Sequence, residues 1–154
     1  MKNFFYFFFQ KSFYEFTIYE RAWTNKKLRL RLRASIELSK WHYMAALVKK
    51  NKSTGDDMFN YGVLKGYIDG SLGSHTAYLK QDYTDRPGFR GLMVNTRENL
   101  YNWTKSADHA NLQVAVHAIG DAGCSVMLDI YEQVARENGL RDRRFRLEHS
   151  QQLA

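Results

Sequence analysis

Segments with a strand pattern alternate with segments of helical periodicity along most of the chain, and this order constrains the fold more than any other feature. The strand patterns lie at residues 28–36, 61–68, 112–117 and 144–149. Helical patterns occupy the intervals between them. Strands separated by helices of about 10–15 residues form parallel sheets through right-handed crossovers. The sequence therefore predicts an α/β fold with four parallel strands in sequential order and three helices between them.

The helical segments have apolar faces and recognisable boundaries. In residues 40–50, apolar side chains recur at steps of three and four residues, which places them on one helical face: Trp41, Met44, Ala45 and Val48. Thr96 has the side chain of an N-cap for the next helix. Both features support the assignment of these intervals to helices.

Charge is distributed unevenly along the 154 residues, whose formal net charge is +7. Residues 1–54 contain twelve Lys and Arg against three Asp and Glu, whereas residues 55–154 contain eleven against thirteen. This confined excess argues against a general phosphate-binding surface, so no nucleic-acid partner is expected. A basic binding module formed by residues 21–52 stays as a minor alternative, and its binding would weaken steeply with salt.

The chain begins with an aromatic stretch whose apolar run, Phe4 to Phe9, is short. It is too short for a membrane span, which needs about 20 apolar residues, and short for a secretory signal. We expect residues 1–18 to form a poorly ordered leader and residues 19–154 to form the domain. No membrane partner is expected. Cys124 is the single cysteine, which excludes an internal disulfide and is compatible with a reducing, cytoplasmic location.

Two histidines end predicted strands. His117 closes the strand of residues 112–117 and His149 closes that of residues 144–149. Their separation of 32 residues is that of one βα unit, so the two imidazoles should lie side by side at one sheet edge. A lone histidine at such a position is more often a hydrogen-bonded core residue. Two at matching positions favour a metal site.

Lys65 lies in the second predicted strand and is followed by a polar loop of about 25 residues, a length that in compact domains is usually functional or disordered. A lysine that points into the mouth of a barrel is costly to desolvate unless it is paired, bound to metal or modified. The alternative is a solvent-facing lysine on an edge strand.

Three segments together resemble a known family: LKGYIDGSLGSHTA at residues 64–77, LQVAVHAIGDAG at residues 112–123 and RFRLEHSQQL at residues 144–153. They are similar to the amidohydrolase superfamily, specifically the YtcJ-like family, also called amidohydrolase family 3. The resemblance covers roughly residues 19–154. It implies a partial TIM-type barrel, approximately strands three to six, and metal-dependent hydrolysis of C–N bonds in small-molecule, non-peptide amides.

The resemblance also implies a metal site. Lys65 matches the lysine that is typically carboxylated and bridges two metals, and His117 and His149 match metal-binding histidines. A carbamate would turn the buried cation into an anionic oxygen ligand for a divalent metal, for which zinc is expected. Glu148 either supports a ligating histidine or pairs with neighbours of Arg146.

The family pattern further indicates residues that contact substrate. Asp69, Gly70 and Ser71 match the polar segment that lines the pocket. His75 stands where the family commonly has arginine, which removes a bidentate partner for a substrate carboxylate. Asp121 either orients substrate or caps the helix that it opens, and the cap is favoured.

Two elements of the superfamily have no counterpart in this sequence. These are the His-x-His pair of the first barrel strand and the aspartate of the eighth strand, which usually acts as the general base. A complete barrel takes about 250 residues. We therefore expect the chain to be inactive on its own. The alternative function is a truncated remnant without catalytic activity that self-associates through exposed sheet edges.

Overall fold

The computed structural model describes residues 5–10 and 13–153, with side chains from Phe16 onward. The described strands form one sheet in the order β1-β2-β3-β4-β5, and every neighbouring pair is parallel. The strands are β1 (Phe5–Gln10), β2 (Arg31–Glu37), β3 (Phe59–Tyr67), β4 (Gln113–Ala118) and β5 (Arg146–His149). The helices are α1 (Phe13–Thr24), α2 (Trp41–Asn51), α3 (Arg97–His109) and α4 (Asp121–Asn138), with a short 3-10 turn, η1 (Leu38–Lys40), before α2.

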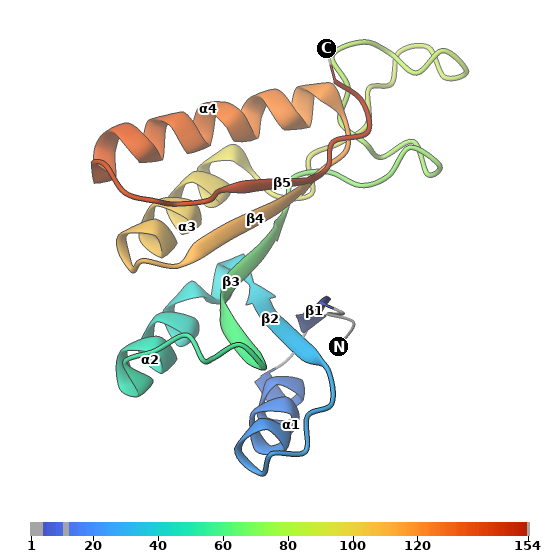
Figure 1. Ribbon diagram of the computed structural model, residues 1–154. Coiled ribbons are helices and arrows are strands. Elements are labelled where there is room, and N and C mark those ends of the chain that lie inside the picture. Colours follow the sequence, from blue (N-terminus) through green and yellow to red (C-terminus); the bar gives the residue numbers. More distant parts are fainter. Residues whose placement is uncertain (1–4, 11–12, 154) are drawn as a thin grey trace.

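This architecture confirms the predicted α/β class and the parallel, sequential order of the four expected strands. One helix follows each of the first four strands, and the long loop after β3 extends beyond the carboxyl ends of the strands (Figure 1). The strand boundaries agree with the predicted ones to within three residues. Such shifts are expected because apolar patterns define the centre of a strand better than its ends.

A fifth strand, β1, lies inside the stretch for which the sequence predicts a poorly ordered leader. It pairs in parallel with β2, from Phe5 opposite Arg31 to Gln10 opposite Ile36. The same segment is too short to cross a membrane but long enough for a strand, and aromatic residues favour strands. The structure therefore has strand and helix where an irregular leader was expected, although residues 1–4 and 11–12 lie outside the described residues.

The hydrophobic core lies between the sheet and the helices. On the sheet side its fully buried members include Ile36, Leu64, Val114 and Val116, and on the helix side they include Met44, Leu100, Met127 and Ile130. Burying one such side chain contributes about 1.5–3 kcal/mol. Within residues 13–153, none of the helices is long and apolar enough to span a membrane.

A bulge in β3 determines which side chains face the core. Between the pairs Arg33–Asn60 and Ser35–Val63, β3 advances by one more residue than β2 does. Gly62 lies at this point with φ +101°, a conformation that other residues rarely adopt. Because of the extra residue, β3 buries side chains on the helix side both before and after the bulge, while Lys65 lies on the opposite face of the sheet.

Both ends of α3 are fixed by polar side chains. The hydroxyl of Thr96 accepts a hydrogen bond from the backbone N–H of Asn99 at 3.2 Å, which confirms the predicted N-cap. Near the other end of α3, the buried carboxylate of Asp108 contacts Arg141 at 2.9 Å and Arg143 at 3.1 Å. These ion pairs attach the segment that leads into β5 to α3, which helps to position β5 beside β4.

Candidate functional site

The candidate site lies at the carboxyl ends of β3, β4 and β5. In the register of the sheet, Tyr67 lies opposite His117, and His117 lies opposite Glu148. His149 is the last residue of β5, as predicted, whereas His117 is followed by one more strand residue, Ala118. Three adjacent parallel strands therefore deliver these side chains to one edge, which is the functional edge of parallel α/β sheets.

The two histidine rings are in contact. Their centroids are 4.7 Å apart and the rings meet edge to face at 65°. Strict alternation along β5 would send His149 to the face opposite that of Glu148. The backbone avoids this because His149 has φ +79° and Ser150 has φ +45°, both in the left-handed region that non-glycine residues seldom occupy. Two unusual backbone conformations in succession thus accompany the histidine pair.

Lys65 is buried on the same face of the sheet, with its side chain 6% exposed. Its ammonium group forms an ion pair with Glu148, which also accepts a hydrogen bond from Arg146 at 2.7 Å. Burial lowers the pKa of Lys65 below its ordinary value, although Glu148 opposes this shift. Of the two roles considered for Glu148, the structure has the ion-pair role, and Lys65 rather than a histidine is its main partner.

Asp69, directly after β3, joins three separate segments. Its carboxylate is fully buried and accepts hydrogen bonds from the backbone N–H groups of Tyr78 (2.9 Å), Ile119 (3.0 Å) and Gly120 (2.8 Å). A carboxylate oxygen of Asp69 also lies 3.5 Å from Nε2 of His117. The expected contact with substrate is therefore not supported for Asp69, because its side chain is enclosed and its oxygens are already occupied.

Gly70 contributes to the site through its backbone. Nε2 of His117 lies 2.7 Å from the carbonyl oxygen of Gly70. A carbonyl oxygen only accepts hydrogen bonds, so Nε2 carries the proton, and in the neutral ring the free lone pair is on Nδ1. The turn after β3 thus selects one tautomer of His117. The side chain of Ser71 is exposed and its hydroxyl lies 2.9 Å from that of Ser74, within the same loop.

His75 has its partners within the long loop. Its Nε2 contacts Asp85 at 2.8 Å, and its ring packs edge to face on Tyr83 with centroids 4.7 Å apart. None of its described contacts reaches His117 or His149. The structure thus places His75 in the architecture of the loop and does not join it to the histidine pair.

Asp121 links the start of α4 to the long loop. Its carboxylate accepts hydrogen bonds from the backbone N–H groups of Lys80 and Ala122, both at 2.9 Å. The favoured cap role is wrong, because the N-cap position is Gly120 and no side chain caps the helix; Asp121 supports the first turn from inside the helix. Asp121 also lines a cavity of about 300 Å³ between this loop and the segment after β5. Both the supporting role in the helix and a position beside a cavity are therefore present.

The chemistry of the donors shows how far they suit a divalent cation. Imidazole nitrogen is a common zinc ligand in its neutral form, and burial, assisted by the nearby His117 and Lys65, lowers the pKa of His149. The paired rings therefore fit as two nitrogen donors. In the described part of the chain, however, no three His, Cys, Asp or Glu side chains converge as a ligand set. Lys65 could complete the set only by leaving Glu148.

Sequence reasoning did not find two features of the site. It did not associate Glu148 with Lys65, and it did not anticipate the positive φ angles of His149 and Ser150. The alternation of side chains along a strand could have indicated the pairing of Glu148 with Lys65, because Glu148 and not His149 shares the face of Lys65. The second had no signal, since neither His nor Ser marks a left-handed backbone as Gly does.

The fold and the site together define a parallel α/β protein with an imidazole pair and a buried lysine at the carboxyl ends of adjacent strands. Residues 6–153 match the family described as the amidohydrolase family. The chain therefore belongs to the amidohydrolase family, and the YtcJ-like resemblance is confirmed.

Several relatives support this assignment. The chain is 42% identical over 137 residues to Protein LONG AFTER FAR-RED 3 of Arabidopsis thaliana, covering 89% of this chain and 24% of the relative. It is 39% identical over 93 residues to Putative amidohydrolase YtcJ of Bacillus subtilis (strain 168), covering 60% and 17%.

Among solved structures, the chain is similar to an uncharacterized metal-dependent hydrolase from Pyrococcus horikoshii OT3, with a TM-score of 0.71 and 26% sequence identity. The similarity covers 84% of this chain and 26% of the other. An uncharacterized metal-dependent hydrolase from Pyrococcus furiosus gives a TM-score of 0.71 and 25% sequence identity, and the similarity covers 83% of this chain and 27% of the other. The chain thus spans about a quarter or less of the length of these proteins.

Proposed function

We propose that this chain forms part of the active site of a metal-dependent hydrolase that cleaves C–N bonds in small, non-peptide amides. The observation that carries the proposal is the contact between His117 and His149 at the carboxyl ends of adjacent parallel strands, beside the buried Lys65. Family membership and the metal-dependent hydrolases of similar fold support the same reading.

His117 and His149 would hold a divalent cation, with zinc as the ion that suits nitrogen donors. Lys65 would join them as a carbamate, whose oxygens would bind the metal. The ion pair between Lys65 and Glu148 would then be lost. When bound, such a metal acidifies water and polarises a carbonyl group. Asp69 and the Gly70 carbonyl hold His117 in place throughout, and the loop that contains Ser71 borders the approach to the pair.

Zinc binding tests the histidine pair without depending on turnover. Isothermal titration of the purified chain with zinc should show binding that falls by about 10- to 100-fold in His117→Ala and in His149→Ala. His109→Ala is the matched control, because His109 is an exposed histidine at the end of α3. Equal loss in all three variants, or no loss in the first two, would refute the assignment.

We also propose a cellular location and partners for the protein. We place it in the cytoplasm, with a small amide as its substrate and without a nucleic-acid partner. The single free cysteine, Cys124, which is buried, supports this location. A phosphate-dependent nucleic-acid interaction would show a steep loss of affinity with salt, which a binding assay with duplex DNA would detect.

The second candidate is an inactive chain that self-associates. It is favoured by the outer edge of β5, which pairs with no strand in the described part of the chain. Unpaired strand edges are templates for pairing with another chain. Sedimentation velocity over a concentration series should then show dimers or larger species, and a monomer at every concentration would reject this candidate.

A further inference from the structure

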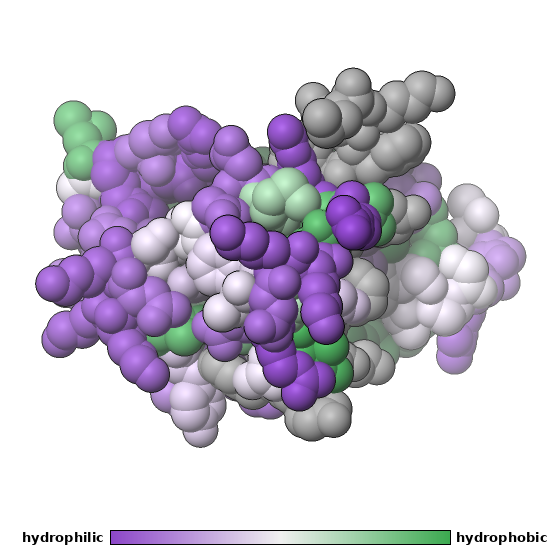
Figure 2. All heavy atoms as spheres, turned by 60° about the horizontal axis from the view of Figure 1, so that its bottom comes forward, coloured by the Kyte–Doolittle hydropathy of each residue, from purple (hydrophilic) through white to green (hydrophobic). Residues whose placement is uncertain are grey.

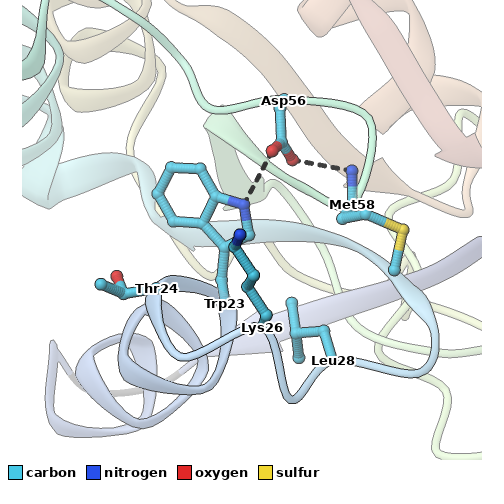
Figure 3. A pocket seen from close by; sticks show the side chains of 6 residues that line it. All are labelled: Trp23, Thr24, Lys26, Leu28, Asp56 and Met58. Carbon is cyan, nitrogen blue, oxygen red and sulfur yellow. Dashed lines mark hydrogen bonds between the residues drawn. The ribbon is translucent and has the colours of Figure 1, made fainter.

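A cavity of about 470 Å³ lies at the opposite end of the sheet from the histidine pair. It is formed where α1 leads into β2 and where the loop after α2 leads into β3 (Figure 3). Its lining residues are Trp23, Thr24, Lys26, Leu28, Asp56 and Met58. The nine residues of β3 separate this end of the sheet from the other by about 26 Å. The cavity is thus distinct from the candidate active site.

The walls of this cavity are mainly apolar. The side chains of Trp23, Leu28 and Met58 are half-buried and border the space in Figure 3. The indole ring is held on two sides, because it packs on Phe59 and its Nε1–H donates to Asp56 at 2.9 Å. A fixed aromatic face beside two flexible apolar side chains suits an apolar group of a ligand, and the volume is in the range of small-molecule sites.

The two charged residues in the lining differ in whether their charged groups already have hydrogen-bond partners. One oxygen of Asp56 accepts from Trp23, and the other accepts from the backbone N–H groups of Met58 (2.8 Å) and Phe59 (3.0 Å). The carboxylate is therefore occupied by three donors. The ammonium group of Lys26, in contrast, has no hydrogen-bond or ion-pair partner in the described part of the chain. Of these two charged groups, it is therefore the ammonium group of Lys26 that has hydrogen bonds left to donate to a ligand.

The surroundings add to this positive charge. Lys27 and Arg29 follow in the same loop and likewise form no ion pair with described residues, and all of the excess positive charge of the chain lies in its first 54 residues. Figure 2 brings this end of the molecule forward and shows hydrophilic side chains with small hydrophobic areas among them. An apolar cavity with a cationic rim attracts ligands that combine an apolar part with a negative charge.

We propose that this cavity binds a small amphiphilic carboxylate, with its apolar part against Trp23, Leu28 and Met58 and its carboxylate at Lys26. This binding is separate from the chemistry at the histidine pair and does not depend on it. It also gives a role to Lys26, one of the basic residues of the region 21–52.

Octanoate is a suitable probe, because it joins an eight-carbon apolar chain to one carboxylate. The chain has three tryptophans, so NMR of the ¹⁵N-labelled protein shows three indole N–H signals, and Trp23→Phe identifies the one from the cavity. Titration with octanoate should shift the Trp23 signal saturably and leave those of Trp41 and Trp103 in place. Octylammonium, with the same apolar chain and the opposite charge, should shift it weakly.

Matched variants separate the charge of Lys26 from the general charge of the loop. Lys26→Gln should weaken octanoate binding by roughly two- to fivefold, the effect of one exposed ion pair. Lys27→Gln removes a charge from the neighbouring residue, which does not line the cavity, and should change binding much less. For the apolar wall, Leu28→Ala should weaken binding by about fivefold, whereas Leu30→Ala, outside the cavity, should not.

The results that overturn the proposal are distinct. If octanoate produces no saturable shift of the Trp23 signal, the cavity does not bind this class of ligand. If octylammonium binds as tightly as octanoate, or if Lys26→Gln and Lys27→Gln behave alike, Lys26 does not recognise the carboxylate. The comparison of the two ligands uses the unaltered chain, so it decides the matter even if a variant fails to fold.

Discussion

His149 lies opposite Ala118 in the register of the sheet, yet its ring contacts that of His117 on the neighbouring strand. A regular strand would direct His149 to the other face, and the left-handed backbone at His149 and Ser150 is what permits the contact. Unusual backbone conformations of this kind cost about 1–3 kcal/mol and concentrate at functional sites. The histidine pair is therefore a local departure from sheet geometry and not a simple consequence of it.

The first prediction is that the isolated chain has no measurable amidase activity even when zinc is supplied. The sequence contains neither a His-x-His pair nor the aspartate that acts as base in the superfamily, so zinc held by the histidine pair would lack both further ligands and the group that takes a proton from water. The measurement is an assay of N-acyl substrates with added zinc, beside His117→Ala. Turnover that this variant abolishes would show that the chain completes a working site by self-assembly.

Replacement of Asp69 by Asn should destabilise the fold by about 2–4 kcal/mol, because three backbone N–H groups lose a charged acceptor in a buried position. Asp85→Asn is the control, since Asp85 is exposed and bonds to His75, and it should change stability by less than about 0.5 kcal/mol. Urea unfolding followed by circular dichroism gives both values. Equal stability of the Asp69 variant and the unaltered chain would contradict the role assigned to this carboxylate.

Gly120 should not tolerate a side chain. A Cβ atom at this position would lie 1.9 Å from the backbone carbonyl oxygen of Tyr78, and a backbone atom cannot move aside as a flexible side chain does. We expect Gly120→Ala to cost about 1–3 kcal/mol. Gly73→Ala should be nearly neutral, because a Cβ there meets nothing within 4 Å. Thermal unfolding of the two variants compares them, and similar melting temperatures would disprove the close approach.

Acid stability should depend on Glu137. A hydrogen bond from Lys105, with further ones from Tyr101 and Gln133, lowers the pKa of Glu137 from 4.5 to about 2. A lowered folded-state pKa gives stability that is present above pH 4.5 and is lost as the pH falls from 4.5 to about 2. Glu137→Gln should therefore flatten the fall in stability over this interval, and Tyr101→Phe should do so partially. Superimposable curves for the unaltered chain and Glu137→Gln would rule this out.

The regular part of the fold could be predicted from the sequence because it rests on local patterns. Apolar periodicity located β2 to β5, and the hydroxyl of Thr96 marked the start of α3. The strand β1 was missed because a continuous aromatic run has neither the period of a strand nor that of a helix. Parallel strands in a sheet can be apolar on both faces, so the absence of alternation did not exclude one.

The candidate site was predictable as a set of residues but not as a set of contacts. Strand-end position and spacing were enough to select His117 and His149, whereas for Lys65 the pattern left a solvent-facing position open and the family resemblance supplied the assignment. The burial of Asp69 and the pairing of Lys65 with Glu148 depend on which segments meet across sequence separations of 50 and 83 residues. Such contacts are decided by tertiary packing; alternation places Lys65 and Glu148 on one face of the sheet, but it does not show which segments meet.

Because of the extra residue at Gly62, the side chains of β3 that face the helices are odd-numbered before the bulge and even-numbered after it. Before the bulge, odd-numbered side chains such as Phe59 and Tyr61 pack against the helices, whereas after it the even-numbered Leu64 does so. Removing this single residue would keep the composition of the strand but would turn Lys65 into the core and Leu64 out of it. An insertion or deletion of one residue between Gly62 and Lys65 would therefore exchange the chemistry of the two faces of the sheet without altering the first half of the strand.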